Sequence, residues 1–446
     1  MKIPIIDGIK TTMTDYETVR LKNLLVVPKD TGIASEYINC TDGIQYVGTL
    51  SGEPRGAVVE TRNGKHYRVQ GNDLVEVSST GAITSRGTIS GTGNSPMAYG
   101  YDLLAVVGGG VGYSWNGSTL TSGVFLQADP TITYSPIDVA WCNQFFFWTD
   151  GLSIYQSSLT NPLSITGFAD AESSPDGITG LVATRDELIV CGRTTIERFR
   201  NVGTGTFTFR SVPGGVLNKG VVSPSAKVRF NNTFAFVGGG AEESPSVWVY
   251  GGTDAQEIAT RDIARSIASV DATQIVMDYY ADSAHKFIIC TLPNGVVHVY
   301  DVATGEWHDR AWQAKYIVSA YGKWWCSKSG AIGNVERIGS EWGESVRREF
   351  STKFLPASQA TSIAKLELKG NWGRYSAPDP QAEVQTSLDG INWSQPRVYT
   401  LGGKDVFDFR PQWRRIGFIK AGRYMAMRFA IDSDAVFQIS ALEINE

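Results

Sequence analysis

The sequence contains few of the residues from which disulfides and metal sites are built. Its 446 residues include five cysteines and four histidines. No Cys-x-x-Cys pair and no histidine-rich tract occurs, and the histidines have no ligand spacing, so we expect neither a zinc site nor a disulfide framework. Free thiols in apolar strands behave as small core residues. The sequence therefore predicts no metal and no cofactor.

A long apolar run and an excess of basic charge are also missing. No apolar stretch reaches the roughly 18 residues of a membrane-spanning helix, and the N-terminal apolar run is too short for a signal peptide. We therefore expect a soluble protein with no membrane anchor, made in the cytoplasm. The formal net charge of −5 excludes a protein that wraps nucleic acid with a basic surface.

Catalytic motifs cannot be recognised either. The glycine-rich run at 108–112 follows an apolar strand but lacks the Lys-Ser/Thr of a phosphate-binding loop. We find no Ser/His/Asp constellation and no isolated reactive cysteine. The prediction is that the protein is not an enzyme.

One pattern recurs along residues 57–337: an apolar strand, a tight polar turn and a second apolar strand. The strand pairs begin at Ala57, Pro96, Asp138, Gly180, Ala226, Val276 and Ile317. Their spacing of roughly 40–50 residues is typical of propeller blades, each of which needs neighbours to bury its apolar face. The repeat predicts a β-propeller of about seven blades. A strand supplied by the other end of the ring, or a lead-in strand at 43–47, would make the count six or eight.

The rest of the chain does not follow this repeat. Residues 1–50 are expected to be an extended N-terminal lead-in that runs over the ring, before a propeller at 51–345. Residues 257–275 are the best helical window. From residue 346 to residue 446 the strands alternate strictly, which predicts an antiparallel β-sandwich with one wet face on each sheet. The fold class is therefore all-β, a propeller followed by a sandwich.

A short motif in the second domain, Ser-Leu-Asp-Gly-Ile-Asn-Trp, has two interpretations. Asp389 and Gly390 predict a hairpin turn with a positive φ, over which Trp393 closes. Similar strings occur in discoidin-type glycan-binding sandwiches and, with one more residue, in the Asp-boxes of sialidases. A glycan platform would need further aromatic side chains, for which only Trp372 and Trp413 are candidates. We favour a structural turn, and a glycan-binding or glycan-cleaving propeller with a carbohydrate-binding sandwich is the alternative.

The segment at residues 171–199 is a more specific indicator of a protein family than this short motif. Residues 171–180 read Ala-Glu-Ser-Ser-Pro-Asp-Gly-Ile-Thr-Gly, followed by Arg-Asp-Glu-Leu-Ile-Val at 185–190 and Thr-Thr-Ile-Glu-Arg-Phe at 194–199. Proline presets φ and glycine accepts the positive φ that follows, so Pro175, Asp176 and Gly177 predict a tight turn at the start of a blade.

The strands after this turn carry two further expectations. Ile189 and Ile196 are expected to face neighbouring blades. Glu197 is expected to pair with Arg185 or Arg198 on the surface.

This segment closely resembles the fourth-blade stretch of the packaged-DNA-stabilisation proteins, the tail hubs of short-tailed phages of the Salmonella podovirus type. Three further places agree in order: Asn-Leu-Leu at 23–25 with Pro-Lys at 28–29, Asp-Gly-Ile-Asn at 389–392, and Trp-Arg-Arg-Ile-Gly at 413–417. The resemblance thus spans nearly the whole chain, with diverged stretches between.

The resemblance implies a structural virion protein of the short tail, made in the host cytoplasm. It implies a homo-hexameric hub that attaches below the portal–adaptor ring, closes the DNA exit channel to retain packaged DNA, and conducts the genome during ejection. A tailspike or tail fibre and a tail needle or plug are further implied partners. Double-stranded DNA would pass through the channel without specific binding. Arg414 and Arg415, in the basic strand, are expected to contact a subunit or partner.

Overall fold

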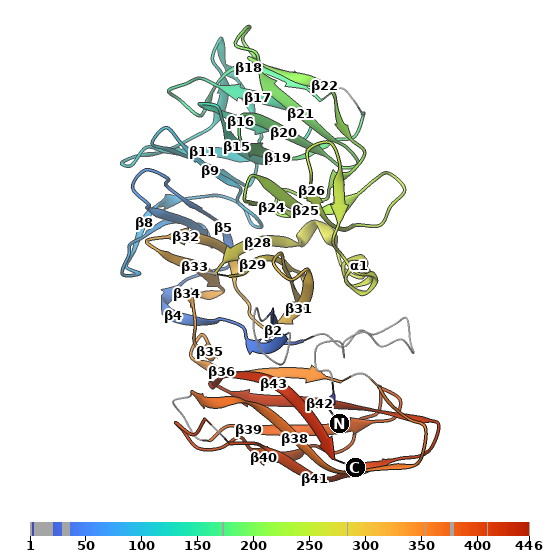
Figure 1. Cartoon of the computed structure of the whole chain (residues 1–446). Coiled ribbons are helices and arrows are strands. Elements are labelled where there is room, and N and C mark those ends of the chain that lie inside the picture. The colour runs from blue at the N-terminus through green and yellow to red at the C-terminus, as the bar shows by residue number, and fades with distance from the viewer. Residues whose placement is uncertain are drawn as a thin grey trace.

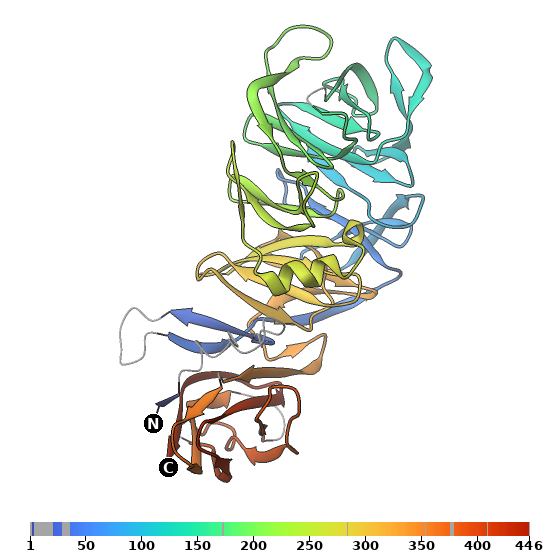
Figure 2. The same cartoon turned by 90° about the vertical axis from the view of Figure 1, so that its right-hand side faces the viewer.

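The computed structural model describes residues 2–3, 21–28, 36–171, 174–282, 284–352, 354–374, 379–407 and 409–445. Lys29, Glu172 and Ser173 of the sequence motifs lie outside the described residues. The chain forms two parts, a propeller and a sandwich, which lie one above the other in Figure 1 and again after a quarter turn in Figure 2. Within the described part, no helix is long and apolar enough to cross a membrane.

Seven sheets between residues 43 and 336 are the blades of the propeller. Blade 1 contains β5 (Pro54–Val59), β6 (His66–Gln70), β7 (Asp73–Val77) and β8 (Ile83–Thr88). Blade 2 contains β9 (Met97–Gly100), β10 (Leu103–Gly108), β11 (Val111–Trp115) and β12 (Leu120–Ser122). Blade 3 contains β15 (Asp138–Cys142), β16 (Phe145–Thr149), β17 (Ser153–Ser157) and β18 (Ser164–Asp170), and is widened by β13 (Val124–Leu126) and β14 (Asp129–Tyr134).

The next three blades continue the series. Blade 4 contains β19 (Ile178–Thr184), β20 (Glu187–Gly192), β21 (Ile196–Asn201) and β22 (Phe209–Leu217). Blade 5 contains β24 (Lys227–Phe230), β25 (Thr233–Gly239), β26 (Ser246–Tyr250), β27 (Ala255–Glu257) and the short β23 (Gly220–Val221). Blade 6 contains β28 (Val276–Ala281), β29 (Lys286–Thr291), β30 (Val297–Asp301) and β31 (Glu306–Arg310).

The seventh blade joins the two ends of the propeller. Its strands are β32 (Lys315–Ala320), β33 (Lys323–Lys328), β34 (Gly330–Glu336) and β4 (Gly43–Leu50). β4 pairs antiparallel with β34 along its whole length, and β32 packs against β5 of blade 1. The strand near residues 43–47 therefore completes the seventh blade instead of adding an eighth. The prediction of an all-β chain with about seven blades and a following sandwich is confirmed.

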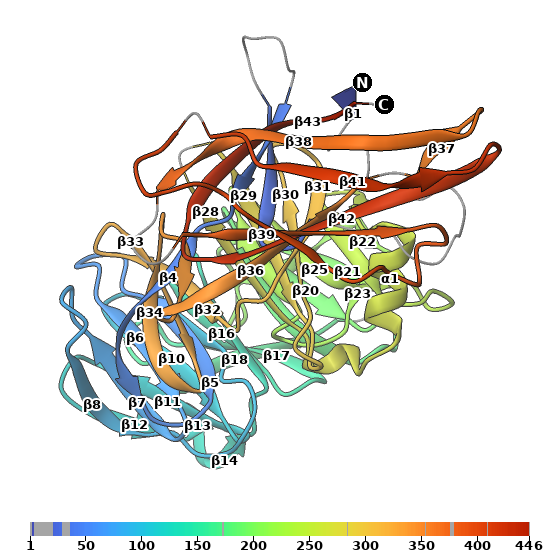
Figure 3. The same ribbon diagram turned by 90° about the horizontal axis from the view of Figure 1, so that it is seen from below.

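The sandwich combines strands from both ends of the chain. One sheet has the order β2 (Leu24–Pro28), β3 (Glu36–Cys40), β43 (Val436–Asn445), β38 (Thr361–Arg374), β41 (Gln412–Ile419), and β1 (Lys2–Ile3) also pairs with β43. The other sheet contains β35 (Ser340–Glu341), β36 (Glu344–Ser351), β42 (Arg423–Ser433), β39 (Gln381–Ser387), β40 (Arg397–Thr400) and β37 (Leu355–Ala357). It is continuous with blade 7, because β35 pairs in parallel with β4. Figure 3 shows β1 beside the C-terminal strand β43.

These pairings differ from the expected path of the lead-in. Where residues 21–50 are described, they form strands of the sandwich and of blade 7 instead of running extended over the ring. Without the lead-in, one sheet of the sandwich would have an exposed edge at β43, and blade 7 would have an exposed edge at β34. β3 covers the first edge and β4 covers the second. The exact boundaries 51–345 and 346–446 stay a prediction.

The helical window is also occupied as expected. α1 (Arg261–Ala268) lies after blade 5 and buries Ile263 and Ile267 against it, and a 3₁₀ turn, η2 (Ala272–Gln274), leads into blade 6.

Candidate functional site

Asn23 makes side-chain contacts that join the propeller to the sandwich, beside the pairing of β4 with β35. Its side-chain Oδ1 accepts a hydrogen bond of 2.9 Å from the Ala311 N–H, next to β31 of blade 6. Its Nδ2 donates to the Arg347 carbonyl of β36 in the sandwich at 2.7 Å. Asn23 is fully buried and has a left-handed φ of 55°, a conformation that asparagine tolerates better than most residues. The first residue of the family-like lead-in is therefore a two-sided clamp.

Charged groups surround this joint. Burial raises the pKa of Glu341 in β35 to about 7, although Arg310, Arg348 and Lys328 act against the shift. The Arg310 guanidinium lies 4.5 Å from the ring centre of Trp312 and donates to the Tyr280 hydroxyl at 2.6 Å. The joint thus has a carboxyl group that changes charge near neutral pH.

Asp176 is the anchor of the family-like segment. Its Oδ2 accepts hydrogen bonds from the Thr194 N–H at 2.6 Å, the Thr194 hydroxyl at 2.9 Å and the Thr195 N–H at 2.9 Å, and its Oδ1 accepts from the Thr195 hydroxyl at 2.9 Å. Burial opposes ionisation of this carboxyl, but the four hydrogen bonds outweigh it and its pKa lies below the ordinary value. Asp176 fixes the start of blade 4 to the turn between β20 and β21.

The other expectations for this segment have mixed outcomes. Gly177 does not have a positive φ, so the expected proline–glycine turn is wrong and the Asp176 side chain holds the segment instead. Pro175, beside it, is exposed. Ile189 and Ile196 are fully buried in the cluster shared with blade 5, as expected.

The expected surface position of Glu197 is wrong. Glu197 is buried, with 3% of its surface exposed. The surface pair is formed by Glu187, whose carboxylate accepts from Arg198 at 2.8 and 3.0 Å and from Arg200 at 2.6 Å. Hydrogen bonds from Arg198 hold the pKa of Glu187 below its usual range.

The Asp389 hairpin is a structural turn in the sandwich. Its carboxylate accepts from the backbone N–H groups of Ile391 and Asn392 at 2.9 and 2.8 Å, and from the Asn392 amide at 2.7 Å. These bonds, first the one from the Asn392 side chain, lower the pKa of Asp389. Gly390 has the expected positive φ, 77°.

The aromatic side chains of a glycan platform are not assembled around this turn. Trp372 and Trp413 are 1% and 3% exposed and belong to the sandwich core. Trp393 instead stacks with the Arg428 guanidinium, whose central carbon lies 4.5 Å from the centre of the Trp393 ring. The geometry therefore gives the glycan alternative no support.

Arg414 and Arg415 lie on β41 with exposed side chains. Arg415 has a φ of 55°, at a point where the pairing of β38 with β41 shifts register. Arg397 of the other sheet donates to the carbonyls of both residues and so fixes the irregular backbone. Neither arginine side chain has a hydrogen bond or ion pair within the part of the chain that the structure describes. Both are available for a partner.

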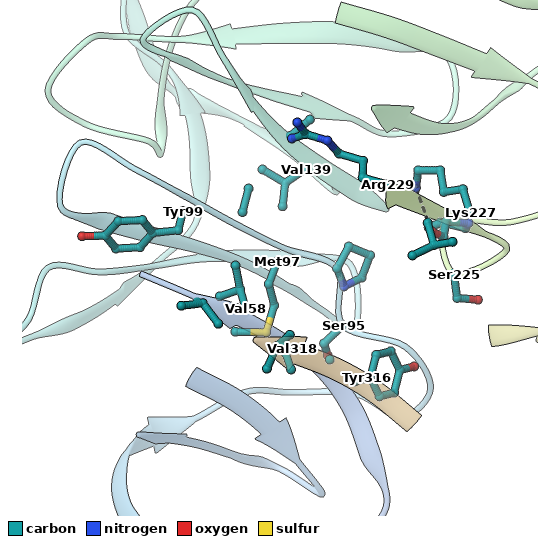
Figure 4. A pocket seen from close by; sticks show the side chains of 18 of the residues that line it. Val58, Ser95, Met97, Tyr99, Val139, Ser225, Lys227, Arg229, Tyr316 and Val318 are labelled. Atoms are coloured by element: carbon teal, nitrogen blue, oxygen red, sulfur yellow. Dashed lines mark hydrogen bonds between the residues drawn. The ribbon is translucent and has the colours of Figure 1, made fainter. Parts of the chain in front are cut away.

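The first strands of the blades enclose a cavity of about 700 Å³ on the propeller axis, with lining residues from all seven blades (Figure 4). A bridge of three side chains closes one end. The Tyr316 hydroxyl of blade 7 donates to Asn94 Oδ1 beside blade 2, and Asn94 Nδ2 donates to Ser225 Oγ beside blade 5 at 2.7 Å. Tyr316 reaches this position with a left-handed φ of 53°, a strained conformation for a bulky residue.

An ion pair near the closed end also connects separate blades. Lys227 of blade 5 lies 2.7 Å from Asp138 of blade 3. It crosses blade 4 at Gly180, where a Cβ would lie 2.8 Å from Lys227 Nζ and 2.9 Å from Asp138 Oδ2. The same Asp138 oxygen accepts the Leu181 N–H at 2.7 Å. A larger residue at position 180 would therefore displace the side chains of this ion pair.

Groups that could do chemistry are few. Ser266, His298 and Asp309 do form a hydrogen-bonded chain, with 2.9 Å from Ser266 Oγ to His298 Nε2 and 2.7 Å from His298 Nδ1 to Asp309 Oδ1. No motif in the sequence singles out this set. However, Ser266 lies in the last turn of α1, where the helix dipole disfavours an alkoxide, and His298 is 1% exposed. The chain of bonds ties α1 to blade 6.

The cysteines and the carboxylates offer no further centre. All five cysteines are free and buried, and burial raises the pKa of Cys142, Cys191, Cys290 and Cys326 to about 12. Such thiols are inert as nucleophiles. No group of three or more metal-ligating side chains occurs among the described residues.

The Asn23 clamp and the Tyr316 bridge were not predicted from the sequence either. Their partners lie 324 and 222 positions away along the chain, and no local pattern reveals such contacts. The one available signal for Asn23 was its place at the start of the family-like Asn-Leu-Leu string.

Two family models and one curated relative match nearly the whole chain. The family described as "Bacteriophage P22 Gp10, beta-propeller" matches residues 1–337, and "Bacteriophage P22 Gp10, beta-sandwich" matches residues 347–446. The "Tail hub protein gp10" of Salmonella phage P22 is 26% identical over 461 residues, covering 96% of this chain and 95% of that protein.

Solved structures give a weaker likeness. BamB from Moraxella catarrhalis has a TM-score of 0.39 at 10% identity and covers 72% of this chain and 96% of its own. The N-terminal domain of Nup159 has a TM-score of 0.40 at 9% identity, with 72% and 99% covered. The two family matches instead follow the observed order of propeller and sandwich, and this chain belongs to the phage P22 Gp10 family.

Proposed function

We propose that this chain is the tail hub of a short-tailed phage, a structural protein of the virion. The observation that carries the proposal is the family match, which covers the propeller and the sandwich in the same order. The relative named as a tail hub protein is similar over 96% of this chain. In this role six copies would attach below the portal–adaptor ring, close the DNA exit channel, and later conduct the genome.

The geometry of the propeller supports an assembly of several copies. Its central cavity of about 700 Å³ is crossed at one end by the Tyr316–Asn94–Ser225 bridge. Duplex DNA, whose major groove alone is about 12 Å wide, does not fit through it. A channel for DNA therefore has to lie between subunits, which agrees with a hexameric ring.

The charge distribution suits a channel through which DNA slides. Residues 347–446 contain 14 Lys and Arg and 11 Asp and Glu, a charge of +3, which leaves −8 for the rest of the chain. An acidic or neutral lumen repels phosphates and does not hold them at ejection. The exposed Arg414 and Arg415 would then contact a subunit, the adaptor ring, a tailspike or fibre, or a needle.

The test is a phage particle assembled without this protein. Packaging acts through the portal, so heads are expected to fill and then to lose their DNA, measured as the nuclease-protected genome over time. Particles supplied with the purified wild-type protein are the control and should retain the genome. Filled heads that keep their DNA without this chain would contradict the proposal.

We also propose that the chain is not an enzyme. Incubation with a fluorophosphonate probe is expected to leave Ser266 unlabelled, with a Ser266→Ala variant as the matched control. Labelling of Ser266 together with turnover of a fluorogenic ester would overturn this part of the proposal.

A further inference from the structure

The central cavity of the propeller is closed at one end and open at the other. The Tyr316–Asn94–Ser225 bridge lies where the first strands of the blades begin. At the opposite end of these strands, the lining residues Thr61, Tyr101, Arg229 and Ser319 are exposed. The cavity is therefore a blind pocket, which a chain end can enter but a continuous chain cannot pass.

A cation without a partner faces this pocket. Two basic side chains on β24 line it, and Lys227 is neutralised by Asp138 at 2.7 Å. Arg229 lies at the exposed open end of the pocket and has no hydrogen bond and no ion pair with any residue in the described ranges. In Figure 4 its guanidinium extends over the pocket towards Val139. A guanidinium in this position is suited to a carboxylate, to which it donates two parallel hydrogen bonds.

The walls around this cation are apolar. Val58, Met97, Val139 and Val318 come from four different blades and point into the pocket in Figure 4. The cavity volume of about 700 Å³ equals that of about twenty water molecules in the liquid. This volume is enough for one or two apolar side chains.

The backbone around the pocket requires polar partners as well. Six of the seven first strands, β5, β9, β15, β19, β28 and β32, end the strand order of their sheets. Each therefore has unpaired N–H and C=O groups on its free edge. A purely apolar ligand would leave these N–H and C=O groups without hydrogen-bond partners, whereas a peptide backbone can form hydrogen bonds with them.

We propose that the open end of this pocket binds the C-terminal end of a partner protein. The terminal carboxylate binds Arg229, and the last side chain, an aliphatic one, lies among Val58, Val139 and Val318. The blind end prevents a chain from threading through the propeller, and the positive charge at the mouth disfavours an N-terminal ammonium. This site goes beyond the hub role.

The probe is a pool of acetylated random pentapeptides, made once as free acids and once as carboxamides. Affinity selection on the full-length protein is expected to enrich free acids with an aliphatic last residue and no carboxamides. Calorimetry with the enriched sequences is expected to give an affinity at least about tenfold weaker for Arg229→Gln, since the loss of even one of the two charged hydrogen bonds has this effect. Arg200→Gln, on the outer part of blade 4, is the matched control and should bind as the wild type does.

Three outcomes would overturn the proposal: no enrichment of free acids, equal binding of acid and carboxamide forms of an enriched sequence, or unchanged affinity in Arg229→Gln. Tight binding of octanoate with the same dependence on Arg229 would also overturn it, since a fatty acid would then be the better ligand. Melting temperatures of both variants report whether they fold, and Arg229 has no intramolecular partner to lose among the described residues. Binding is measured on the isolated chain, so its failure leaves the hub role standing.

Discussion

The propeller and the sandwich are built from the chain in opposite ways. Six of the seven blades consist of strands that follow one another in sequence, and neighbouring blades are tied by side chains such as Asp138. In the sandwich, β43 from the C-terminus pairs with β1 and β3 from the N-terminus. The propeller is thus mostly local, whereas the sandwich cannot be completed without residues that precede the whole propeller.

This difference gives the first 50 residues an importance beyond their length. β4 closes the ring, Asn23 clamps the ring to the sandwich, and β2 and β3 extend a sandwich sheet. Variants in this segment should therefore disturb both parts of the molecule, more strongly at the ring closure than at the clamp.

The largest effect is expected from breaking the ring closure. Ile44 of β4 is fully buried with Tyr280, Phe287 and Trp312. Ile44→Asp would bury an unpaired carboxyl group and should lower the free energy of unfolding by about 4 kcal/mol or more. Tyr46→Asp, on the same strand at a position 42% exposed, is the control and should change it by about 1 kcal/mol at most. Guanidinium unfolding measures both, and equal stabilities would refute a role of β4 in closure.

A smaller loss is expected at the clamp. Asn23→Ala leaves the Ala311 N–H and the Arg347 carbonyl without their partners. Each unsatisfied buried group costs about 1–3 kcal/mol, so two would cost about 2–6 kcal/mol. Because Ala311 is exposed and water can reach its N–H, the total should lie in the lower half of that range, at about 2–4 kcal/mol. The propeller and the sandwich should then unfold in two calorimetric transitions.

The neighbouring residue provides the control for the clamp. Lys22 hydrogen-bonds the backbone of Glu349 in the sandwich through its own N–H at 2.9 Å. Lys22→Ala keeps this backbone bond and should leave the unfolding transition of the wild type unchanged. A single unchanged transition in Asn23→Ala as well would contradict the clamp.

A still smaller effect follows from pH. Burial raises the pKa of Glu341 from 4.5 to about 7 at the joint, and that of Asp278 from 3.8 to about 6 in the propeller. Between the two values of each group the unfolded chain binds fewer protons than the folded protein, so the free energy of unfolding falls as pH rises. Glu341→Gln should remove about 1–3 kcal/mol of decline between pH about 4.5 and about 7.

Asp278→Asn distinguishes the pH dependence of stability that arises in the propeller from the pH dependence that arises at the joint. This variant should change the fall in the free energy of unfolding only below pH about 6. The reason is that the pKa of Asp278 is 3.8 in the unfolded chain and about 6 in the folded protein. Urea unfolding at intervals of half a pH unit measures both variants. An unchanged slope in Glu341→Gln would show that the carboxyl is solvated in the folded protein.

Most of the fold could be predicted because its signals are local. The alternation of apolar and polar residues has the period of a strand, and seven strand pairs at regular spacing determine the blade count. The pairing of β4 with β34 could not be predicted, since nothing in residues 43–50 specifies a partner near residue 333. The same limit applies to β3 and β43 in the sandwich.

The individual sites were harder to predict than the fold. The expectation for Glu197 failed because this residue lies with Phe199 on the buried side of β21, whereas Arg198 and Arg200 alternate with them on the more exposed side. Asp176 was singled out as part of a turn, but its four side-chain hydrogen bonds depend on Thr194 and Thr195, whose position only the folded blade provides. Asp389 and Gly390 were predicted correctly because the whole motif is contained within one hairpin.

The smallest effect on stability is expected for the exposed arginines of the sandwich. Reversing both charges, Arg414→Glu with Arg415→Glu, should change the free energy of unfolding by only about 0.5 kcal/mol, because neither side chain has a partner among the described residues.

If these residues contact a subunit or the adaptor ring, the same variant should attach poorly to DNA-filled heads. Lys404→Glu with Lys420→Glu makes an equal charge change at two other exposed positions of the sandwich and should attach normally. Attachment is measured by cosedimentation with heads, and binding of duplex DNA at physiological salt should be weak and equal in all three proteins. Normal attachment of the Arg414/Arg415 variant would remove these residues from the interface, and tight DNA binding that the variant loses would place the basic strand on the DNA path instead.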